Sequence, residues 1–201
     1  MIIGVTGGVG CGKSAVMDML KNEFGAEIIL ADNVGHEVME PKEDAYLKIV
    51  EHFGADMIDD DGVIDRKKLG AYVFNNKEEL EYLNSIVHPA VKKRIIEKID
   101  KIQSDNEEGE PLIAIEAALL LEDNYDEICD KVIYVYADEA TRRQRLKESR
   151  GYTDDKTDSI MHNQMSEEEF TKRCDDVLDN SKNLCITLNN LQKIVDKYKG
   201  L

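Results

Sequence analysis

Short apolar segments alternate with longer amphipathic segments along most of the chain. Residues 2–5, IIGV, form a short apolar run that predicts a buried strand. Residues 15–24 instead carry their apolar side chains at helical spacing, on one face. By the same criteria, further strands are predicted at residues 26–32, 112–115, 131–138 and 183–188, with a closing helix at 190–198. Because helical segments separate the strands, we predict an α/β protein with a parallel sheet that has helices on both faces.

The segment between the second and third predicted strands interrupts this alternation. It runs for about eighty residues without a convincing strand, which is too long for a simple crossover connection. We predict that residues 33–110 form a mostly helical insert, and that the polar stretch from Gln103 to Pro111 is a loop that returns the chain to the sheet. The core is then formed by residues 1–32 and 111–201.

A glycine-rich turn joins the first strand to the first helix. The segment TGGVGCGKS has the P-loop spacing, Gly7-x-x-x-x-Gly12-Lys13-Ser14, between a strand and a helix. Glycines let the backbone curl and direct its N–H groups at an anion, while Lys13 reaches the β- and γ-phosphates and the Ser14 hydroxyl binds Mg²⁺. We therefore predict a nucleoside triphosphate site made by Gly8, Val9, Gly10, Cys11, Gly12, Lys13, Ser14 and Ala15.

Composition and charge restrict the partners of this site. The 201 residues are 42% hydrophobic, which is enough for one sizeable core, and the formal net charge of −16 argues against a nucleic-acid partner. No signal peptide or membrane span is evident, so we expect a soluble protein of the cytoplasm with no obligate protein partner. The cysteines are widely spaced and predict reduced thiols without a structural metal: Cys11, Cys129, Cys174 and Cys185.

The densest basic stretch in this acidic chain is TRRQRLKESR, which ends at Arg150. If the stretch is helical, Arg143, Lys147 and Arg150 share one face. For Arg142 and Arg143, a solvated face with salt bridges is the favoured interpretation. Arg150 stands directly before Gly151, where a helix would stop, and is predicted to move with a mobile segment over the phosphates.

Asp32 ends the second predicted strand. In an open parallel sheet the ligand crevice lies beyond the carboxyl ends of the strands, which would place Asp32 at the same edge as the P-loop. It could accept the proton of a hydroxyl group that attacks the γ-phosphorus. The alternative is that Asp32 caps the following helix.

At this point the chain resembles the dephospho-CoA kinase family over nearly its whole length. The resemblance rests on an ordered set of motifs: TGGVGCGKS, AD with Asp32, HFGADMID, IDRKKLGAYVFNN, LNSIVHPAV, ALLLED, the RL…SRG segment, NQMS and CDDVLDNS. It implies transfer of the γ-phosphate of ATP to the ribose 3′-hydroxyl of dephospho-CoA, the last step of coenzyme A synthesis. It also implies a P-loop kinase core, a helical CoA-binding insert and a mobile lid at about 142–170.

The resemblance also implies roles for individual residues. Lys13, Asp32 and Arg150 would be catalytic, and Arg145 and Asn180 would join the ATP site. The implied substrate-binding residues are Asp32, Arg66, His88, Pro89, Leu119 and Gln164.

Several features depart from the family pattern. The chain has Leu30 where the family often has a second aspartate, and Glu116 is an open candidate for a second metal ligand. The spacing from Arg145 to Arg150 is one residue longer than usual, so which arginine clamps the phosphates stays open. His88 could instead support a turn before Pro89. The remaining alternatives are another small-molecule or nucleoside kinase and a non-enzymatic nucleotide switch.

Overall fold

The computed structural model describes residues 1–106 and 109–200 of the chain. The chain divides into two compact units, one made of residues 1–29 with 106–201 and the other of residues 30–105. The predicted ranges 1–32, 33–110 and 111–201 stay a prediction. Residues 107–108 and 201, which belong to those ranges, and part of the predicted return loop lie outside the described residues.

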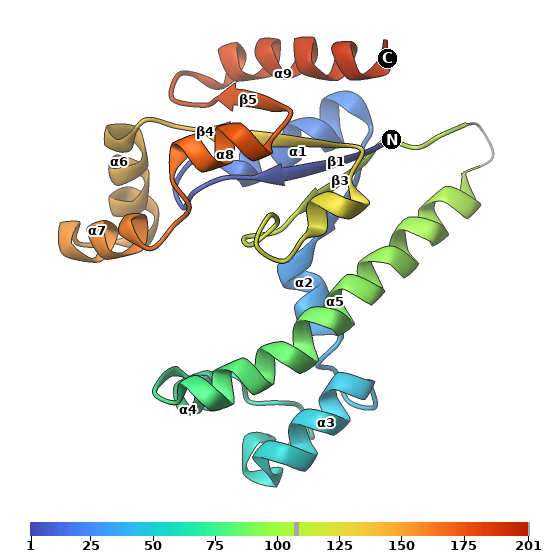
Figure 1. Cartoon of the computed structure of the whole chain (residues 1–201), viewed down its shortest axis with the longest axis vertical. Coiled ribbons are helices and arrows are strands. Elements are labelled where there is room, and N and C mark those ends of the chain that lie inside the picture. Colours follow the sequence, from blue (N-terminus) through green and yellow to red (C-terminus); the bar gives the residue numbers. More distant parts are fainter. Residues whose placement is uncertain (107–108, 201) are drawn as a thin grey trace. The chain divides into compact units, whose positions relative to one another are not determined.

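The first unit is built on a five-stranded sheet with the order β2-β3-β1-β4-β5 (Figure 1). Its strands are β1 (Ile2–Thr6), β2 (Glu27–Leu30), β3 (Ile113–Glu116), β4 (Lys131–Tyr136) and β5 (Asp176–Asp179). The central strand β1 pairs in parallel with both neighbours, so that Val5 is opposite Glu116 on one side and Ile133 on the other. This parallel sheet, flanked by helices, confirms the predicted fold class.

Burial explains why these short runs form strands. Ile3, Val5, Ile133 and Val135 have no exposed surface, as expected for parallel strands that are covered on both faces. The edge strand β5 is different, because only Leu178 among its four residues is fully buried. A short edge strand of this kind leaves little unpaired backbone for another chain to join.

Helices connect the strands. They are α1 (Lys13–Phe24), the 3₁₀ turn η2 (Tyr125–Ile128), α6 (Glu139–Arg150), α7 (Asp154–His162), α8 (Glu167–Arg173) and α9 (Leu184–Lys199). Helix α1 contacts β1 and β3, and α9 contacts β5. Stacking of Phe170 on Tyr134, with ring centroids 4.6 Å apart, joins α8 to β4. Helix α6 ends at Arg150 with Gly151 as its C-cap, where the sequence predicted that a helix would stop.

The predicted fifth strand at 183–188 is wrong, because these residues begin α9. Thr187, Leu191 and Val195 are fully buried at intervals of four residues, whereas Leu184 and Ile186 are exposed. The apolar residues thus follow the period of a helix, and the Asn183 side chain caps its first turn. The fifth strand is instead formed by the sequence DVLD at the sheet edge. Its two aspartates interrupt the apolar pattern from which strands were predicted.

Other predicted boundaries shift by a few residues. The second strand ends at Leu30, and Ala31 and Asp32 already belong to a helix. The third strand begins at Ile113, one residue later than predicted. The fourth ends at Tyr136, because the Asp138 carboxylate caps α6 by accepting the Thr141 N–H.

The second unit is helical. It contains α2 (Ala31–Glu37), α3 (Asp44–Phe53), the 3₁₀ turn η1 (Ala55–Met57), α4 (Arg66–Phe74) and the long helix α5 (Lys77–Asp105). Its apolar core gathers Ile49, Met57, Ile64, Leu69 and Val73. Because α5 continues to Asp105, the predicted loop from Gln103 is wrong in its first three residues.

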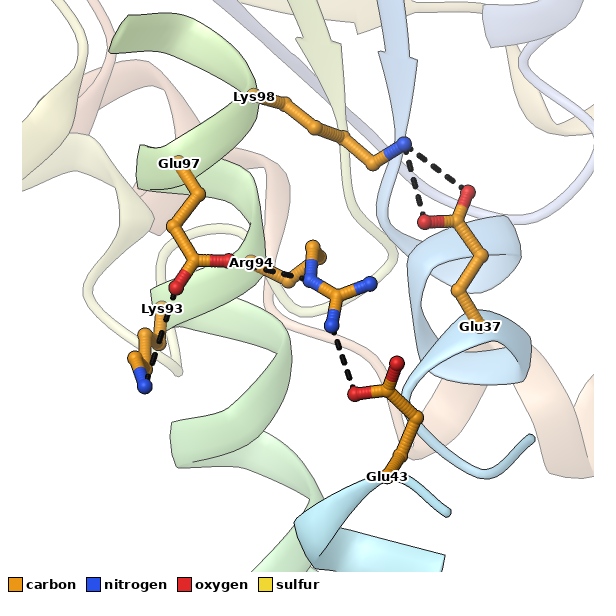
Figure 2. A network of polar contacts seen from close by, with 6 residues as sticks. All are labelled: Glu37, Glu43, Lys93, Arg94, Glu97 and Lys98. Carbon is orange, nitrogen blue, oxygen red and sulfur yellow. Dashed lines mark hydrogen bonds and ion pairs between the residues drawn. The ribbon is translucent and has the colours of Figure 1, made fainter. Parts of the chain in front are cut away.

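Ion pairs join α5 to its neighbours within this unit (Figure 2). Arg94 lies 2.7 Å from Glu43, the residue that precedes α3, and Lys98 lies 3.0 Å from Glu37 at the end of α2. Glu97 extends the network along α5 to Lys93. The charged flank of α5 therefore fixes its packing on α2 and on the start of α3.

Among the described residues, no helix combines the length and apolarity that a membrane span needs.

Candidate active site

The loop between β1 and α1 has the backbone of an anion cradle. Gly7, Gly10 and Gly12 have φ angles of 146°, 83° and 87°, in the region that favours glycine. A Cβ on Gly7 would collide with the carbonyl oxygen of Val135, and one on Gly12 would collide with the Asn180 amide. Glycine at positions 7 and 12 is therefore required by the turn conformation and also by the close approach of the neighbouring strand and of the Asn180 side chain.

Lys13 is held over this loop. Its Nζ donates a hydrogen bond of 2.9 Å to the Gly7 carbonyl and lies 3.9 Å from the Glu116 carboxylate. Glu116 ends β3 beside β1, at the carboxyl edge of the sheet. Both side chains are mostly buried, so the ammonium group is aimed across the loop rather than into bulk solvent.

The donor set near the loop fits Mg²⁺. Ser14 offers an exposed hydroxyl in the first turn of α1, and Glu116 offers a carboxylate at the neighbouring strand end. No group of three or more candidate His, Cys, Asp or Glu ligands occurs among the described residues. Mg²⁺ suits such a sparse site, because it keeps several waters and takes its remaining ligands from substrate phosphates.

Two arginines of α6 donate hydrogen bonds to carbonyl oxygens of the loop. Arg145 donates to the Cys11 carbonyl at 3.2 Å and to the Asn180 carbonyl at 2.8 Å. Arg142 donates from Nε to the Val9 carbonyl at 2.9 Å and from Nη2 to Oε1 of Gln164 at 2.6 Å. The same Gln164 oxygen accepts the Val9 N–H at 3.2 Å. Helix α6 thereby supplies positive charge directly at the loop of an acidic protein.

Asn180 anchors the P-loop to other elements of the first unit through hydrogen bonds. This buried residue follows β5, donates from Nδ2 to the Cys11 carbonyl at 2.8 Å, and accepts the Thr187 hydroxyl at 2.9 Å. Its backbone N–H donates to the Tyr136 carbonyl at 2.7 Å. Asn180 therefore links the loop to β4 and α9, and its side chain is committed to protein partners.

The Cys11 thiol contributes little chemistry. Burial raises its pKa, and the positive charge of Lys13 only partly opposes this. At neutral pH the thiol stays protonated and is a poor nucleophile. All four cysteines, each in the described part of the chain, are free.

The other predicted site residues fall in several places. Leu119 follows β3 and is 46% exposed, while Arg150 ends α6 with its guanidinium carbon 5.9 Å from the Tyr152 ring. Arg66 is exposed at the start of α4, in the second unit. His88 is half-buried beside Pro89 inside α5, so the alternative of a turn at this point is wrong.

Asp32 is exposed in the first turn of α2, also in the second unit. Leu30 occupies the N-cap position, and no side chain makes a capping hydrogen bond there. The alternative that Asp32 is the helix cap is therefore wrong.

Arg142 is the residue that sequence reasoning missed. The pattern favoured a salt-bridged surface, which describes Arg143, paired with Glu139 and Asp158, but not its neighbour. The available signal was the spacing of Arg142 and Arg145, since residues three apart lie on the same face of a helix. That face is the one that α6 turns towards the loop.

A parallel sheet with a glycine cradle after its central strand, a lysine over the cradle and arginines beside it defines a P-loop kinase. The family model described as "Dephospho-CoA kinase" matches residues 1–185. The chain belongs to the dephospho-CoA kinase family.

Curated relatives span the same length. A dephospho-CoA kinase of Halalkalibacterium halodurans is 38% identical over 99% of this chain and 97% of the relative. One from Carboxydothermus hydrogenoformans is also 38% identical, over 98% of this chain and 94% of its own. The similarity therefore includes the helical second unit as well as the P-loop.

Solved structures agree in fold. TT1252 from Thermus thermophilus superposes with a TM-score of 0.80 at 28% identity, covering 98% of this chain and 97% of that one. Dephospho-CoA kinase from Campylobacter jejuni gives a TM-score of 0.74 at 25% identity, covering 99% and 98%. A shikimate kinase from Bacteroides thetaiotaomicron, at 12% identity, 98% coverage of both chains and a TM-score of 0.53, is similar in fold alone.

Proposed function

We propose that this protein transfers the γ-phosphate of ATP to the ribose 3′-hydroxyl of dephospho-CoA, giving CoA and ADP. The observation that carries the proposal is the family match over residues 1–185, which spans the P-loop, the helical unit and the basic helix α6. The geometry of the P-loop and Lys13 supports the nucleotide half of the reaction.

In this reaction the 3′-oxygen forms a bond to the γ-phosphorus while the bond from that phosphorus to the β–γ bridging oxygen breaks. The hydroxyl proton goes to Asp32, and ADP carries away the electron pair of the broken bond. Lys13 and the loop N–H groups balance the charge on the phosphoryl oxygens. Mg²⁺, when bound by Ser14 and the phosphates, with Glu116 as a second candidate ligand, supplies further positive charge.

We propose that dephospho-CoA contacts Arg66, His88, Pro89, Leu119 and Gln164. Within the second unit, a cavity of about 560 Å³ supports part of this proposal. It is lined by Pro89, Tyr82 and the two cations Lys48 and Lys93, which suit a ligand with an apolar stem and an anionic pyrophosphate. Arg145, with Asn180 holding it, would complete the ATP site from the first unit.

The remaining partners follow from this chemistry. A reaction that uses ATP is expected in the cytoplasm, and the mobile lid at about 142–170 would close over the nucleotide. The net charge of −16 supports the absence of a nucleic-acid partner, and we propose no obligate protein partner.

A coupled ADP-release assay tests the proposal. With Mg²⁺ and ATP we expect turnover only when dephospho-CoA is added, and CoA as the product by mass spectrometry. Lys13→Ala is the matched inactive control, with an expected loss of about 3 kcal/mol or more in transition-state stabilisation. Turnover with deoxyadenosine or a nucleoside monophosphate and none with dephospho-CoA would assign another kinase. ATP binding without turnover on any acceptor would indicate a switch.

A further inference from the structure

Arg142 is a half-buried cation that makes no ion pair within the described residues. Arg94, Arg143 and Arg173 each pair with an acidic side chain in this strongly acidic protein. Arg142 instead contacts the neutral oxygens of Val9 and Gln164 through Nε and Nη2. Its Nη1 has no hydrogen-bond partner within residues 1–106 and 109–200. A guanidinium whose hydrogen-bond partners in the described part of the chain are neutral favours an additional anion beside it.

The guanidinium lies directly on the P-loop. A Cβ on Gly8 would be 2.5 Å from Arg142 Nη2 and 2.8 Å from its Cζ, so the guanidinium packs closely against the backbone at position 8. Beside it opens a cavity of about 840 Å³, which is lined by Gly8, Arg142 and Gln164 among others. The Arg142 side chain therefore borders both the P-loop and an open cavity.

Gln164 joins Arg142 to the P-loop through one oxygen atom. Its Oε1 accepts hydrogen bonds from both the Val9 N–H and the Arg142 guanidinium. A loop N–H and an arginine that meet on one oxygen are the donors that a phosphate oxygen would take. In this structure the amide oxygen of Gln164 accepts from both of these donors.

We propose that Arg142 is a catalytic residue that binds an oxygen of the transferring γ-phosphoryl group, in the place that Gln164 Oε1 occupies here. Gln164 is a positioning residue, because it holds Arg142 against the loop until the phosphate displaces it. Charge spreads over the phosphoryl oxygens in the transition state, and a guanidinium there stabilises that charge. This inference rests on the proposed kinase function and adds a residue that the sequence pattern assigned to a solvated surface.

The test compares Arg142→Met with Arg143→Met, its neighbour on α6. Arg143 pairs with Glu139 and Asp158, so its replacement removes an equal charge from the same helix. We expect kcat for CoA formation to fall about 100-fold or more in Arg142→Met, since an arginine of this type contributes roughly 10³–10⁵-fold. In Arg143→Met it should stay within about threefold of wild type.

A second measurement distinguishes a catalytic role of Arg142 from an effect of Arg142 on the conformation of the P-loop. Mg·ADP with aluminium fluoride imitates the transferring phosphoryl group, and wild type should bind it more tightly than Mg·ADP. Arg142→Met should lose this difference while its affinity for Mg·ADP changes little. Gln164→Met should lower kcat less than Arg142→Met does. Arg142→Lys keeps the positive charge but loses the planar guanidinium that can donate two hydrogen bonds at once, so its kcat should still fall at least about tenfold. This variant replaces Arg142→Met in the test if Arg142→Met fails to fold.

Near-normal kcat in folded Arg142→Met would overturn the inference, as would an equal loss of affinity for Mg·ADP and for its fluoride complex. A kcat loss in Arg150→Ala that exceeds the loss in Arg142→Lys would assign the role to Arg150. If the wild type makes no CoA, the kinase proposal fails by itself, and the fluoride affinities still decide the role of Arg142.

Discussion

At the scale of single residues, Asn180 is the polar group on which the P-loop depends most. Its amide joins the Cys11 carbonyl to the Thr187 hydroxyl, and its own carbonyl accepts from Arg145. A buried amide with this many partners is costly to remove, because the groups left behind lose hydrogen bonds without gaining water.

Asn180→Ala should lower the free energy of unfolding by about 2–3 kcal/mol and weaken ATP binding, because the Cys11 peptide is no longer held. Asn183→Ala is the control, since the Asn183 side chain caps α9 and, among the described residues, makes no hydrogen bond to the P-loop. It should cost about 1 kcal/mol and leave ATP affinity unchanged. Urea unfolding and calorimetric titration measure both quantities. Equal ATP affinity in the two variants would contradict a role in holding the loop.

Asp32 is open to a direct test because it is exposed and caps nothing. Asp32→Asn should change stability by no more than about 0.3–1 kcal/mol, the value of a charge near a helix N-terminus. If Asp32 accepts the hydroxyl proton, kcat should fall roughly 10²–10⁴-fold with ATP affinity retained. A loose transition state would reduce that loss, because the proton then leaves late. Full turnover in a stable Asp32→Asn protein would place the base elsewhere.

The cysteines should differ sharply in reactivity. Cys11 is 1% exposed and burial raises its pKa, so it forms little thiolate at pH 8, whereas Cys185 is exposed. Iodoacetamide should alkylate Cys185 in the native protein and leave Cys11 unmodified until urea is added. Peptide mass spectrometry checks this order. Early labelling of Cys11 would mean that the loop opens in solution.

At the scale of elements, α5 combines a buried apolar row with a charged flank. Val91, Ile95 and Ile99 are spaced four residues apart and buried. Arg94 and Lys98 of the same helix form ion pairs with Glu43 and Glu37 (Figure 2). Pro89 interrupts the hydrogen-bond ladder of α5, which costs about 3 kcal/mol in an isolated helix. Packing and the ion pairs of the second unit must offset this cost.

Arg94→Met should therefore lower the free energy of unfolding by about 1 kcal/mol, because two carboxylates lose a half-buried partner. Lys77→Met is the matched control on α5, since the pair of Lys77 with Glu81 is well exposed. Its effect should be close to zero. Urea unfolding at low salt and at 0.5 M salt should show the Arg94 effect shrinking with screening. The same small effect in both variants would mean that the network is not stabilising.

At the scale of the whole molecule, charge is distributed unevenly. The chain has 42 acidic and 26 basic side chains, yet Lys13, Arg142 and Arg145 converge on one loop. The acidic remainder repels itself and keeps phosphate backbones away, while the loop keeps a local positive field for its ligand.

Moderate salt should raise the melting temperature of the unliganded protein, because self-repulsion outweighs the exposed ion pairs at this net charge. The measurement is calorimetry between low salt and about 0.3 M, where the screening length falls to several ångströms. NaCl and KCl should act alike, which excludes binding of a specific cation. A melting temperature that falls with salt would show that ion pairs dominate instead.

Much of the fold could be predicted because its signals are local. The first strand, the P-loop and the first helix follow one another directly within residues 2–24, and each limits the conformation of the next. The parallel sheet followed from the alternation of strands and helices. The prediction of the fifth strand failed because the sequence DVLD has little apolar character. These residues form a strand at the sheet edge because they pair with β4.

The sequence by itself determined the P-loop, the class of reaction and the family, because these depend on residues adjacent in the chain or on an ordered set of motifs. Only the tertiary structure decided that Arg142 lies on the loop and that Asn180 fastens it. Those contacts join residues 133 and 169 positions apart. Which arginine of a helix meets a loop depends on how the helix rotates when it packs, and that rotation is set by the side chains of every element it touches.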